Sequence, residues 1–436
     1  MNVYLQALGC RLNEAEREDW ARRFRAAGCT VVCSPEDAHV LVLNSCAVTI
    51  PAAKQSRQYA RRLHRRNPRA RLVVTGCYAQ LEKERVAALV GVDQVVGNDE
   101  KDRLVELVIG EMAPANMPMM AQDLEDARRF PGARTRAFVK VQDGCRNRCT
   151  FCVITVARGE ERSRPIEQVV NQIEALAASG YQEAVLTGVH LGGYGSDRGT
   201  TLHDLVDAIL SRTRIARLRL GSLEPWDLPE GFFELWSDPR MCPHLHLPMQ
   251  SGSDSVLRRM ARRCSSGRFR RLATEARAVV PHLTLTTDLM VGFPGETESE
   301  FAETLTFARE VAFTNAHVFA WSPRPETAAA RLRGRVPSEI VRRRSKVLHE
   351  LAASMVEACL GAAIGVARPV LWEGRGAPLP AGAHRWTGYT DTYLRAQIDV
   401  PAGVDLENTI TWVAPSAVIE GKRLLVLWPM DGSSVT

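Results

Sequence analysis

The chain has 436 residues, of which 24% are charged and 45% are hydrophobic. These proportions are typical of a soluble globular protein, and they exclude a disordered, collagen-like or small disulfide-rich chain. The length exceeds the size at which one hydrophobic core stops growing, so we expect several domains. The net charge of +6 permits an anionic partner without requiring one.

The sequence gives no sign of a membrane or secreted protein. No apolar run reaches the ~18–20 residues that a membrane span needs. The first residues, Met1 to Tyr4, have neither the basic nor the apolar region of a secretory signal. We therefore expect a cytoplasmic protein whose 11 cysteines stay reduced and act as metal ligands, nucleophiles or core residues.

Residues 1–112 are predicted to form an α/β domain. Apolar strand-like runs alternate with helical stretches, a pattern typical of a parallel sheet with right-handed crossovers. The predicted strands are Asn2–Leu8, His39–Asn44 and Arg71–Thr75, and the predicted helices are Glu14–Ala27, Ala52–Arg66 and Gln80–Val90.

A cysteine follows each of these three strands, namely Cys10, Cys46 and Cys77. Parallel strands end at the same edge of a sheet, where open α/β sheets bind ligands, so we expect the three thiols to converge. A glycine precedes Cys10 and Cys77, which lets the backbone come close to a bulky group. Two interpretations stay open: an iron–sulfur cluster with an open iron, or three cysteines buried at strand ends.

Residues 113–134 are predicted to be a linker, because Pro, Met and mixed charges occur there without periodicity. A second strand–helix series covers residues 135–365, and its six strands fit a partial (β/α)6 barrel rather than a complete eightfold one. The predicted strands are Ala137–Gln142, Glu183–Leu186, Arg217–Leu220, His244–Leu247, Leu283–Val291 and Ala316–Ala320. The loops after them are rich in Gly, Ser, Cys and Gln, as expected at the carboxyl end of such a barrel, where active sites lie.

Residues 366–431 are predicted to form a small all-β module like an OB-type barrel. Its predicted strands are Arg368–Trp372, Thr392–Ile398, Thr409–Ala414 and Arg423–Leu427.

The sharpest motif is C-x3-C-x2-C, formed by Cys145, Cys149 and Cys152 after the first barrel strand. Structural zinc sites take four protein ligands, and the next histidine after the motif is His190. Three thiolates on an iron–sulfur cube leave one iron free to bind a small cofactor. A zinc site with a distant fourth ligand stays open as the alternative.

The chain resembles the radical S-adenosylmethionine (SAM) methylthiotransferases over essentially its whole length. The loop Cys145–Cys152 is similar to the radical SAM motif, and the C-terminal module is similar to a TRAM domain. Other similar segments are Ala137–Gly144, Ala157–Gly159, Ser163–Pro165, Leu186–Val189, His246–Ser253, Thr287–Asp288, Val291–Glu296 and Ser322–Pro325.

The resemblance implies two [4Fe-4S] clusters. Cys145, Cys149 and Cys152 would hold the cluster that binds SAM and passes it the electron that yields a 5′-deoxyadenosyl radical. The trio at the edge of the N-terminal sheet, Cys10, Cys46 and Cys77, would hold an auxiliary cluster, which accepts a methyl group from another SAM and supplies sulfur. An unactivated aromatic C–H bond is beyond general acid–base chemistry, whereas a cofactor radical can open it.

Five residues are candidates for contacts with the bound SAM: Phe151, Thr187, Gly188, Ser222 and Gln250. The last four have an alternative reading as turn residues or satisfied core amides. A non-catalytic iron–sulfur protein that binds RNA or senses redox state would need none of them, nor Asp288, so their joint presence favours an enzyme.

The segment Leu8–Glu16 resembles the subgroup that acts on N6-threonylcarbamoyladenosine at position 37 of tRNA. Family members that modify isopentenyladenosine of tRNA or an aspartate of a ribosomal protein are the alternatives. The resemblance implies the tRNA anticodon loop and an electron donor such as a flavodoxin or ferredoxin as partners, with no membrane and no stable protein partner.

A basic stripe runs along the predicted second helix and its exit, with Tyr59 among its cations. Its members are Lys54, Arg57, Arg61, Arg62, Arg65, Arg66, Arg69 and Arg71. Such a stripe can hold phosphates, and a flipped loop base needs an aromatic or Arg plane nearby. The alternative is an ordinary solvated helix face.

The chain departs from the family pattern at three places. Thr155 and Val156 stand where the family usually has Pro and an aromatic residue, which changes the shape expected for the active-site loop. Cys264 replaces an aromatic residue, and Glu326 replaces a common Gly.

Overall fold

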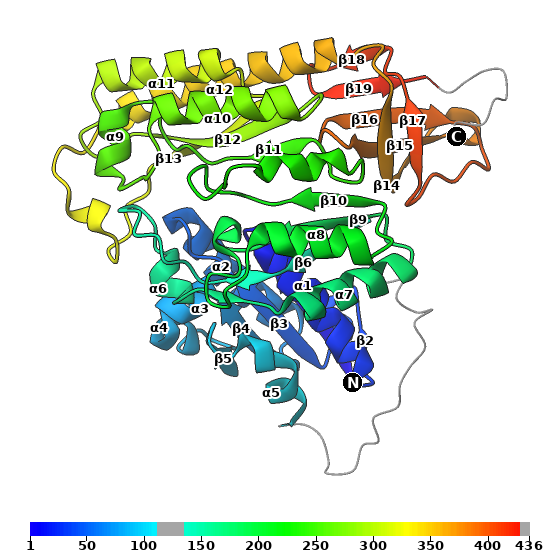
Figure 1. Cartoon of the computed structure of the whole chain (residues 1–436). Helices are drawn as coiled ribbons and strands as arrows, with labels where there is room; N and C mark the ends of the chain where they lie inside the picture. The colour runs from blue at the N-terminus through cyan, green and yellow to red at the C-terminus, as the bar shows by residue number, and fades with distance from the viewer. Residues whose placement is uncertain (111–134, 428–436) are drawn as a thin grey trace.

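The computed structural model describes residues 1–110 and 135–427, so the predicted linker 113–134 lies outside the described residues. Three parts follow one another along the chain (Figure 1). An N-terminal sheet lies below, a curved set of parallel strands covered by helices lies above it, and a C-terminal all-β part lies at the right. The predicted mixed α/β class, with a parallel N-terminal sheet and an all-β C-terminal part, is confirmed.

The N-terminal sheet has the order β2-β1-β3-β4-β5, and all its strand pairs are parallel. The strands are β1 (Asn2–Ala7), β2 (Thr30–Val31), β3 (Val40–Ser45), β4 (Arg71–Gly76) and β5 (Gln94–Val96). The helices are α1 (Arg11–Ala26), α2 (Ile50–Arg66), α3 (Cys77–Leu81), α4 (Lys83–Ala87) and α5 (Leu104–Gly110). Every residue of β3 is buried, because helices cover both faces of this central strand.

Two predicted helices differ from the observed ones. The single helix predicted over Gln80–Val90 is wrong: Glu82, with φ −129° and ψ 47°, leaves the helical conformation and separates α3 from α4. The first helix begins at Arg11 rather than at Glu14, directly after Cys10. Two helices thus begin at or directly after a cysteine, since α1 follows Cys10 and α3 begins at Cys77.

The second part contains six parallel strands in two groups of three, ordered β10-β9-β6 and β11-β12-β13. These strands are β6 (Arg136–Lys140), β9 (Glu183–Thr187), β10 (Arg217–Leu220), β11 (His244–His246), β12 (Thr284–Val291) and β13 (Asn315–Ala320). Their helices are α7 (Ile166–Ala178), α8 (Leu202–Arg212), α9 (Asp254–Arg259), α10 (Ser266–Val279), α11 (Glu298–Val311) and α12 (Ser338–Ala362). Single-residue bridges join β10 to the β11 segment, Leu218 with Met241 and Ser222 with His246, so the wall continues between the two groups.

Two further elements frame the first loop of this partial barrel. The ribbon β7 (Gln142–Asp143) and β8 (Arg162–Ser163) is antiparallel and brackets the cysteine loop. The short helix α6 (Ile154–Arg158) follows the last cysteine. Helix α1 packs against the barrel where Ala15 meets Phe138 and Val185, so the N-terminal part lies directly against β6 and β9.

The C-terminal part is a six-stranded sheet with the order β17-β14-β15-β16-β19-β18. The strands are β14 (Arg368–Pro378), β15 (His384–Thr390), β16 (Arg395–Val400), β17 (Ile410–Val413), β18 (Ala417–Ile419) and β19 (Arg423–Val426). Two of them, β15 and β18, were not predicted. The strand predicted from Thr392 is wrong at its start, because Thr390–Leu394 is a turn in which Tyr393 has φ +66°.

This turn joins the C-terminal sheet to the amino end of the barrel. The ring of Tyr393 lies 4.7 Å from that of His244, and its hydroxyl accepts a hydrogen bond of 2.7 Å from Arg11. Arg219 donates to the Asp391 carbonyl at 2.9 Å, and the Thr284 hydroxyl donates to the Thr392 carbonyl at 2.6 Å. The turn therefore contacts both other parts of the molecule.

Candidate active site

The loop Cys145–Cys152 lies after β7, on the left-hand side of Figure 1, where α6 follows it. Backbone hydrogen bonds hold its ends: Cys145 donates to Gly159 at 3.1 Å and Thr150 donates to Met260 at 3.0 Å. A Cβ atom on Gly144, whose φ is +74°, would lie 1.8 Å from the Glu160 carbonyl oxygen, so only glycine fits there.

The three sulfur atoms of this loop are close enough to affect one another. Burial raises the pKa of the Cys145 thiol to about 11 and that of Cys152 to about 12, and the neighbouring thiols of the trio add to both shifts. Burial also raises the pKa of Cys149, which Arg262 opposes. These thiols are therefore protonated at neutral pH unless a metal replaces the proton.

Arg262 is the main residue of this site that the sequence analysis missed. Its side chain is buried, and it donates to Cys149 Sγ at 3.8 Å, to Glu224 at 2.7 Å and to the Pro248 carbonyl. The guanidinium also lies 4.3 Å from the ring centre of Trp226. The only sequence signal for Arg262 is its place two residues before Cys264, which departs from the family pattern.

Thr187 and Gly188 lie at the end of β9, next to Gln142. The Thr187 carbonyl accepts a hydrogen bond from Val141 at 2.9 Å. The Gln142 amide donates to the Gly144 carbonyl at 2.9 Å and accepts from the His190 backbone at 2.8 Å. Gln142 thus ties the segment after β9 to the cysteine loop.

The other predicted SAM contacts lie on neighbouring strand ends. Ser222 is exposed and bridges to His246, and Phe151 packs in a small cluster that includes Phe293. Gln250 has φ +77°, a conformation that is costly for a residue with a side chain and that often marks a functional position. Its backbone pairs with β12 through the Asp288 carbonyl at 2.8 Å.

His190 lies beside Cys145, together with Glu161, and one ligand atom of each lies within 4.8 Å of the others. Burial would lower the pKa of His190, but hydrogen bonds to Asp227, at 2.5 Å, and to Glu161 raise it above its ordinary value. This group draws on one cysteine of the loop only. It does not unite the C-x3-C-x2-C trio around a single zinc ion.

The second trio lies at the carboxyl edge of the N-terminal sheet. Cys46 and Cys77 are buried, whereas Cys10 is exposed. A Cβ atom on Gly9 would lie 2.6 Å from Cys46 Sγ, which places the Cys10 segment directly against Cys46. Burial raises the pKa of the Cys46 thiol to about 11, and Cys10 and Cys77 both contribute. The three thiols that the sequence predicted to converge therefore lie together.

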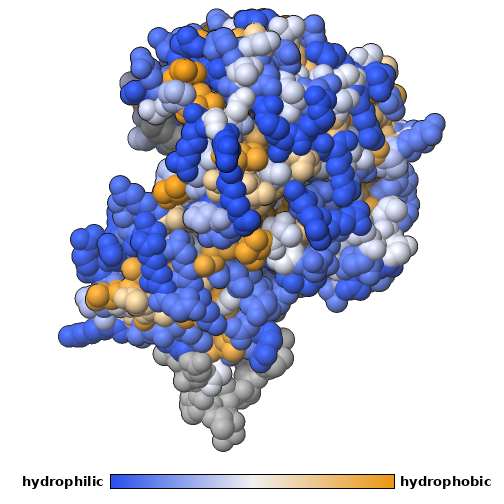
Figure 2. All heavy atoms as spheres, turned by 90° about the vertical axis from the view of Figure 1, so that its left-hand side faces the viewer, coloured by the Kyte–Doolittle hydropathy of each residue, from blue (hydrophilic) through white to orange (hydrophobic). Residues whose placement is uncertain are grey.

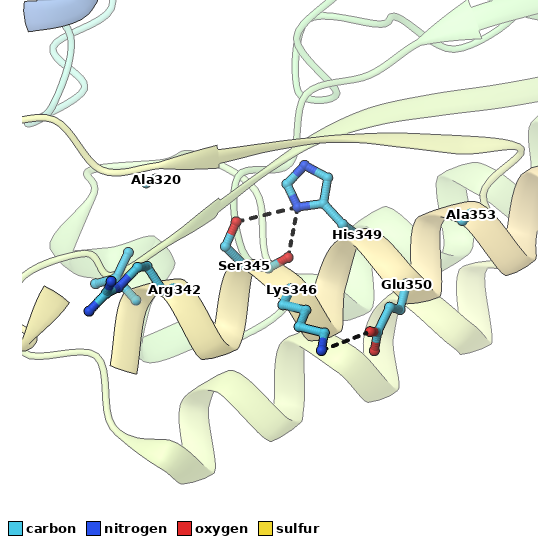
Figure 3. Close-up of a pocket in the computed structure, with 8 residues that line it drawn as sticks. Ala320, Arg342, Ser345, Lys346, His349, Glu350 and Ala353 are labelled. Atoms are coloured by element: carbon cyan, nitrogen blue, oxygen red, sulfur yellow. Dashed lines mark hydrogen bonds and ion pairs between the residues drawn. The ribbon is translucent and has the colours of Figure 1, made fainter. Parts of the chain in front are cut away.

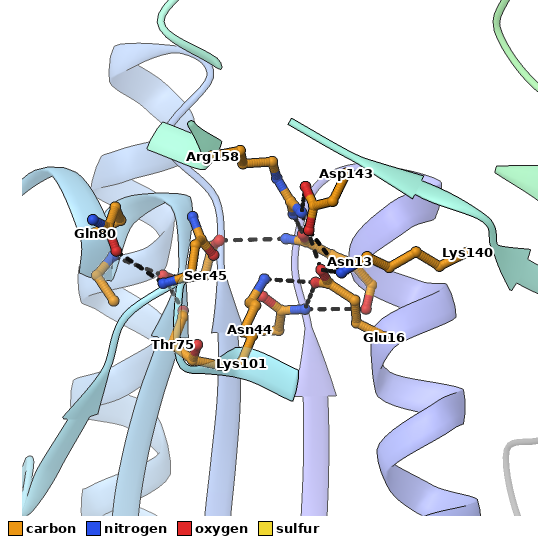
Figure 4. A network of polar contacts seen from close by, with 12 residues as sticks. Asn13, Glu16, Asn44, Ser45, Thr75, Gln80, Lys101, Lys140, Asp143 and Arg158 are labelled. Atoms are coloured by element: carbon orange, nitrogen blue, oxygen red, sulfur yellow. Dashed lines mark hydrogen bonds and ion pairs between the residues drawn. The ribbon is translucent and has the colours of Figure 1, made fainter. Parts of the chain in front are cut away.

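A largely buried group of charged residues, drawn in Figure 4, has its Arg158 close to Cys10 and Cys77 of this second trio. We name it the Glu16 cluster, and its members are Glu16, Lys101, Lys140, Asp143 and Arg158. Glu16 pairs with Lys101 at 2.6 Å, with Lys140 at 3.2 Å and with Arg158 at 3.0 Å. Arg158 also pairs with Asp143 at 3.0 Å, two residues before Cys145. The cluster therefore links the segment before Cys145 to the second trio.

The face on the left of Figure 1 is turned to the viewer in Figure 2, where apolar residues gather in the middle between polar side chains above and below. Two segments that follow cysteines carry exposed apolar residues: Val48 and Ile50 after Cys46, and Val156 after Cys152, are each about half exposed. The backbone of Ile50 donates to the Ser322 hydroxyl at 3.2 Å, so the start of α2 meets the loop after β13.

The arginines of the basic stripe on α2 differ in their contacts: some are paired with other side chains, and others are exposed to solvent. Arg57 donates to the Tyr78 hydroxyl at 3.3 Å, beside Cys77, and Arg66 pairs with Glu36 at 2.5 Å. The exposed members on the helix include Arg61, Arg62 and Arg65. Arg62 lies 5.8 Å from the ring centre of Tyr59.

A separate hollow of about 530 Å³ lies between α12 and the end of β13 (Figure 3). Its lining includes Arg342, Lys346 and His349, and Lys346 pairs with Glu350 at 3.9 Å. None of its lining residues is a cysteine, so the hollow belongs to neither trio.

Among the described helices, none is long and apolar enough to cross a membrane.

A parallel partial barrel with a three-cysteine loop at the carboxyl end of its first strand is the architecture of a radical SAM protein. A model of the Radical SAM superfamily matches residues 139–308, and a model of the uncharacterized protein family UPF0004 matches residues 2–97. The radical SAM methyltransferase TsrM of Kitasatospora setae has a similar fold, with a TM-score of 0.57 at 16% identity over 76% of this chain and 77% of that one.

Curated relatives narrow the class. The threonylcarbamoyladenosine tRNA methylthiotransferase MtaB of Thermotoga maritima is 37% identical over 85% of this chain and 86% of its own length. The protein of the same name from Bacillus subtilis is 36% identical over 90% and 89% of the two chains. The tRNA-2-methylthio-N(6)-dimethylallyladenosine synthase of Sorangium cellulosum is 35% identical over 94% and 90%. The chain belongs to the radical SAM methylthiotransferase family, and it is a transferase.

The family implies a [4Fe-4S] cluster and SAM, and the residues at the barrel loop fit them. The three thiols are mutually close, and the flanking Gly144 has no room for a side chain. Arg262 already donates to one sulfur, as expected for a thiolate that carries negative charge. Cys145, Cys149 and Cys152 would hold this cluster.

Proposed function

We propose that this chain adds a 2-methylthio group to N6-threonylcarbamoyladenosine at position 37 of tRNA, using two [4Fe-4S] clusters. The observation that carries the proposal is a second cysteine trio beside the Glu16 cluster, which also includes Asp143 at the start of the barrel loop. Arg158, six residues after Cys152, lies close enough to Cys10 and Cys77 for their charges to interact. A second trio of thiols next to the radical SAM loop is what delivery of sulfur to one substrate needs.

The two trios divide the work in this proposal. When bound, the cluster at the barrel loop supplies the electron that cleaves SAM, and the cluster at Cys10, Cys46 and Cys77 supplies the methylthio group. The fit at the second trio rests on the contact of Gly9 with Cys46 and on the mutual effect of the three thiols.

The chain's own residues bind and orient the reactants. Arg262 fixes Cys149 and Glu224, and the backbone of Gln250, held in its rare conformation, joins the strand ends that face the cofactor. Thr187 and Gly188 present backbone groups at the end of β9. Ser222, exposed at the end of β10, and Phe151 complete the predicted SAM contacts.

A chemical difference between the two modifying groups favours N6-threonylcarbamoyladenosine over isopentenyladenosine as the substrate. The threonylcarbamoyl group carries a carboxylate, whereas the isopentenyl group is apolar. Arg11 directly follows Cys10, and its positive charge lies near His244 and His317 of the barrel strands, where it contributes to lowering the pKa of both. Arg11 also donates to the Tyr393 hydroxyl at 2.7 Å, which holds this cation against the barrel strands, and a cation there suits a carboxylate.

The exposed arginines of α2 are our proposed contact with the tRNA backbone. Helix α2 begins four residues after Cys46, and its first residue meets the loop after β13. Arg57, Arg61, Arg62, Arg65 and Arg66 then lead away from the cysteine site along one helix. Salt-sensitive phosphate contacts follow from such an arrangement.

Several further points belong to the same proposal. The three domains are residues 1–112, 135–365 and 366–431. An electron donor such as a flavodoxin or ferredoxin reduces the barrel cluster. The protein acts on tRNA in the cytoplasm.

The decisive experiment is mass spectrometry of tRNA nucleosides from cells that lack this gene. We expect N6-threonylcarbamoyladenosine to persist without its 2-methylthio derivative, and the unaltered gene to restore that derivative. The matched control is the gene with Cys10, Cys46 and Cys77 changed to Ala, which should not restore it.

Two results would redirect the proposal. Loss of the methylthio group from isopentenyladenosine instead would assign the other tRNA substrate. Unchanged tRNA together with an unmodified ribosomal-protein aspartate would assign a protein substrate and overturn the proposal.

A further inference from the structure

The Glu16 cluster carries more positive than negative formal charge. Its buried or nearly buried cations are Lys101, Lys140 and Arg158, and its buried anions are Glu16 and Asp143, so three minus two leaves one surplus cation within the cluster. One further carboxylate, Asp102, lies 3.9 Å from Lys140, but it is exposed to solvent, which screens its charge. All five side chains are buried or nearly so. A surplus charge withdrawn from water is expensive unless an opposite charge lies nearby.

The sulfur atoms of the second trio are the groups that face this surplus. Burial opposes the charged form of Arg158, but Glu16, followed by Cys77, Asp143 and Cys10, holds the pKa of Arg158 well above its ordinary value. Lys101 also lies near Cys77. The cluster is thus placed where three thiolates would balance its charge.

The hydrogen-bond partners of the cluster come from the cysteine loops themselves. Arg158 donates to Asn13 at 2.8 Å, and Asn13 lies three residues after Cys10. Asn44, two residues before Cys46, donates to Glu16 at 2.8 Å. Asp143 lies two residues before Cys145, so Arg158 touches a neighbour of each trio (Figure 4).

The barrel trio differs within residues 1–110 and 135–427. The cation that contacts it there is Arg262, and Glu224 matches that charge at 2.7 Å. The two trios therefore differ in the charge that their surroundings offer, although both consist of three thiols.

We propose that Arg158 is a positioning residue for the auxiliary cluster: it supplies the surplus charge that balances the thiolates of Cys10, Cys46 and Cys77, and it fixes their loops relative to the barrel loop. This inference rests on the second cluster of the proposed function. A nearby positive charge favours the reduced, more negative form of a cluster, so Arg158 raises its midpoint potential. A role in packing alone would leave that potential unchanged.

The test uses the full chain with Cys145, Cys149 and Cys152 changed to Ala, so that only the auxiliary cluster remains. After anaerobic reconstitution, iron per chain is measured, and the midpoint potential is followed by electron paramagnetic resonance. We expect Arg158→Gln to shift the potential to more negative values, Arg158→Lys to keep most of the original potential, and Glu16→Gln to shift it in the opposite direction. The double variant Arg158→Gln/Glu16→Gln restores one surplus cation and should return the potential toward the starting value.

The chain offers a matched control in Arg344, another buried arginine, which pairs with Glu296 at 2.8 Å away from both trios. Arg344→Gln should leave the potential unchanged. An unshifted potential in Arg158→Gln, or an equal shift in Arg344→Gln, would overturn the inference. If Arg158→Gln does not fold, the Glu16→Gln variant decides. A midpoint potential that becomes more positive supports the charge role, and one that becomes more negative or stays unchanged rejects it.

These outcomes separate the inference from the proposed function. A chain without the three barrel cysteines that binds no iron would refute the auxiliary cluster, and with it both proposals. A chain that binds a cluster whose potential ignores Arg158 refutes this inference alone.

Discussion

The two cysteine trios of this chain are built in opposite ways. Cys145, Cys149 and Cys152 occupy eight consecutive residues of one loop, whereas Cys10, Cys46 and Cys77 come from the ends of three parallel strands. The first trio exists as soon as one loop folds. The second forms only when the whole N-terminal sheet is in register.

Their surroundings differ in the same way. Arg262, paired with Glu224, accompanies the barrel trio. The sheet trio borders a largely buried ionic cluster with residues from α1, η2 (Lys101–Arg103), β6, β7 and α6. A local motif can thus carry its own ligands, but the charge balance of the assembled site depends on contacts between two parts of the molecule.

The largest expected effect comes from removing either trio. Changing Cys145, Cys149 and Cys152 to Ala should abolish SAM cleavage and leave about four irons per chain instead of about eight, because one cube is lost. Changing Cys10, Cys46 and Cys77 should leave the same iron count but preserve SAM cleavage and stop methylthiolation. Iron analysis measures the number of clusters, and detection of 5′-deoxyadenosine measures SAM cleavage. SAM cleavage that survives without the barrel trio would contradict the different roles assigned to the two trios.

The second-largest expected effect concerns Arg262, which contacts Cys149 of the barrel trio. Arg262→Met should slow SAM cleavage by roughly 10- to 100-fold, because a buried hydrogen bond to a charged group is worth about 1.5–3 kcal/mol. Arg263→Met is the control, since this neighbour is exposed. Equal rates in the two variants would show that Arg262 has no special role at Cys149.

The α2 arginines probe the outer side of the assembled site. Replacing Arg61, Arg62 and Arg65 by Gln should weaken tRNA binding and flatten its salt dependence, with a loss of roughly 0.7–0.9 in the log–log slope for each phosphate contact removed. The control replaces three exposed arginines elsewhere, namely Arg268, Arg271 and Arg309. Identical salt slopes for both triple variants would reject the stripe as the tRNA contact.

Tyr393 tests how the C-terminal turn supports Arg11. Tyr393→Phe keeps the ring between Tyr389 and His244 but removes the hydroxyl that accepts from Arg11. We expect the free energy of unfolding to fall by about 1–3 kcal/mol, measured by denaturant titration. Tyr389→Phe is the control, and a larger loss there would place the important hydroxyl elsewhere.

The smallest expected effect concerns pH. Burial, with a contribution from Arg219, lowers the pKa of His244 well below its ordinary value, so this residue stays neutral in the folded chain. The unfolded chain binds a proton at His244 below about pH 6.5, and the free energy of unfolding therefore decreases as the pH falls through that value. His244→Gln should flatten this decrease between about pH 6.5 and 5; an unchanged slope would contradict a neutral His244.

Local patterns predicted much of this molecule. The strands β1, β3, β4 and β9 to β13 were predicted within two residues at each end, because alternating helices and apolar runs are local signals. The barrel motif and the cysteines after β1, β3 and β4 were likewise readable from spacing. Short strands such as β15 and β18 were missed, since their pairing partners rather than their own residues define them.

What the sequence by itself determined is the fold class, the two sets of cysteines and the membership of the family. Only the tertiary structure brought Glu16 to Arg158, 142 positions apart, and Arg11 to Tyr393, 382 positions apart. Such contacts depend on the packing of whole domains, and no spacing rule along the chain reaches that far. The same packing gives the second trio its charged neighbours.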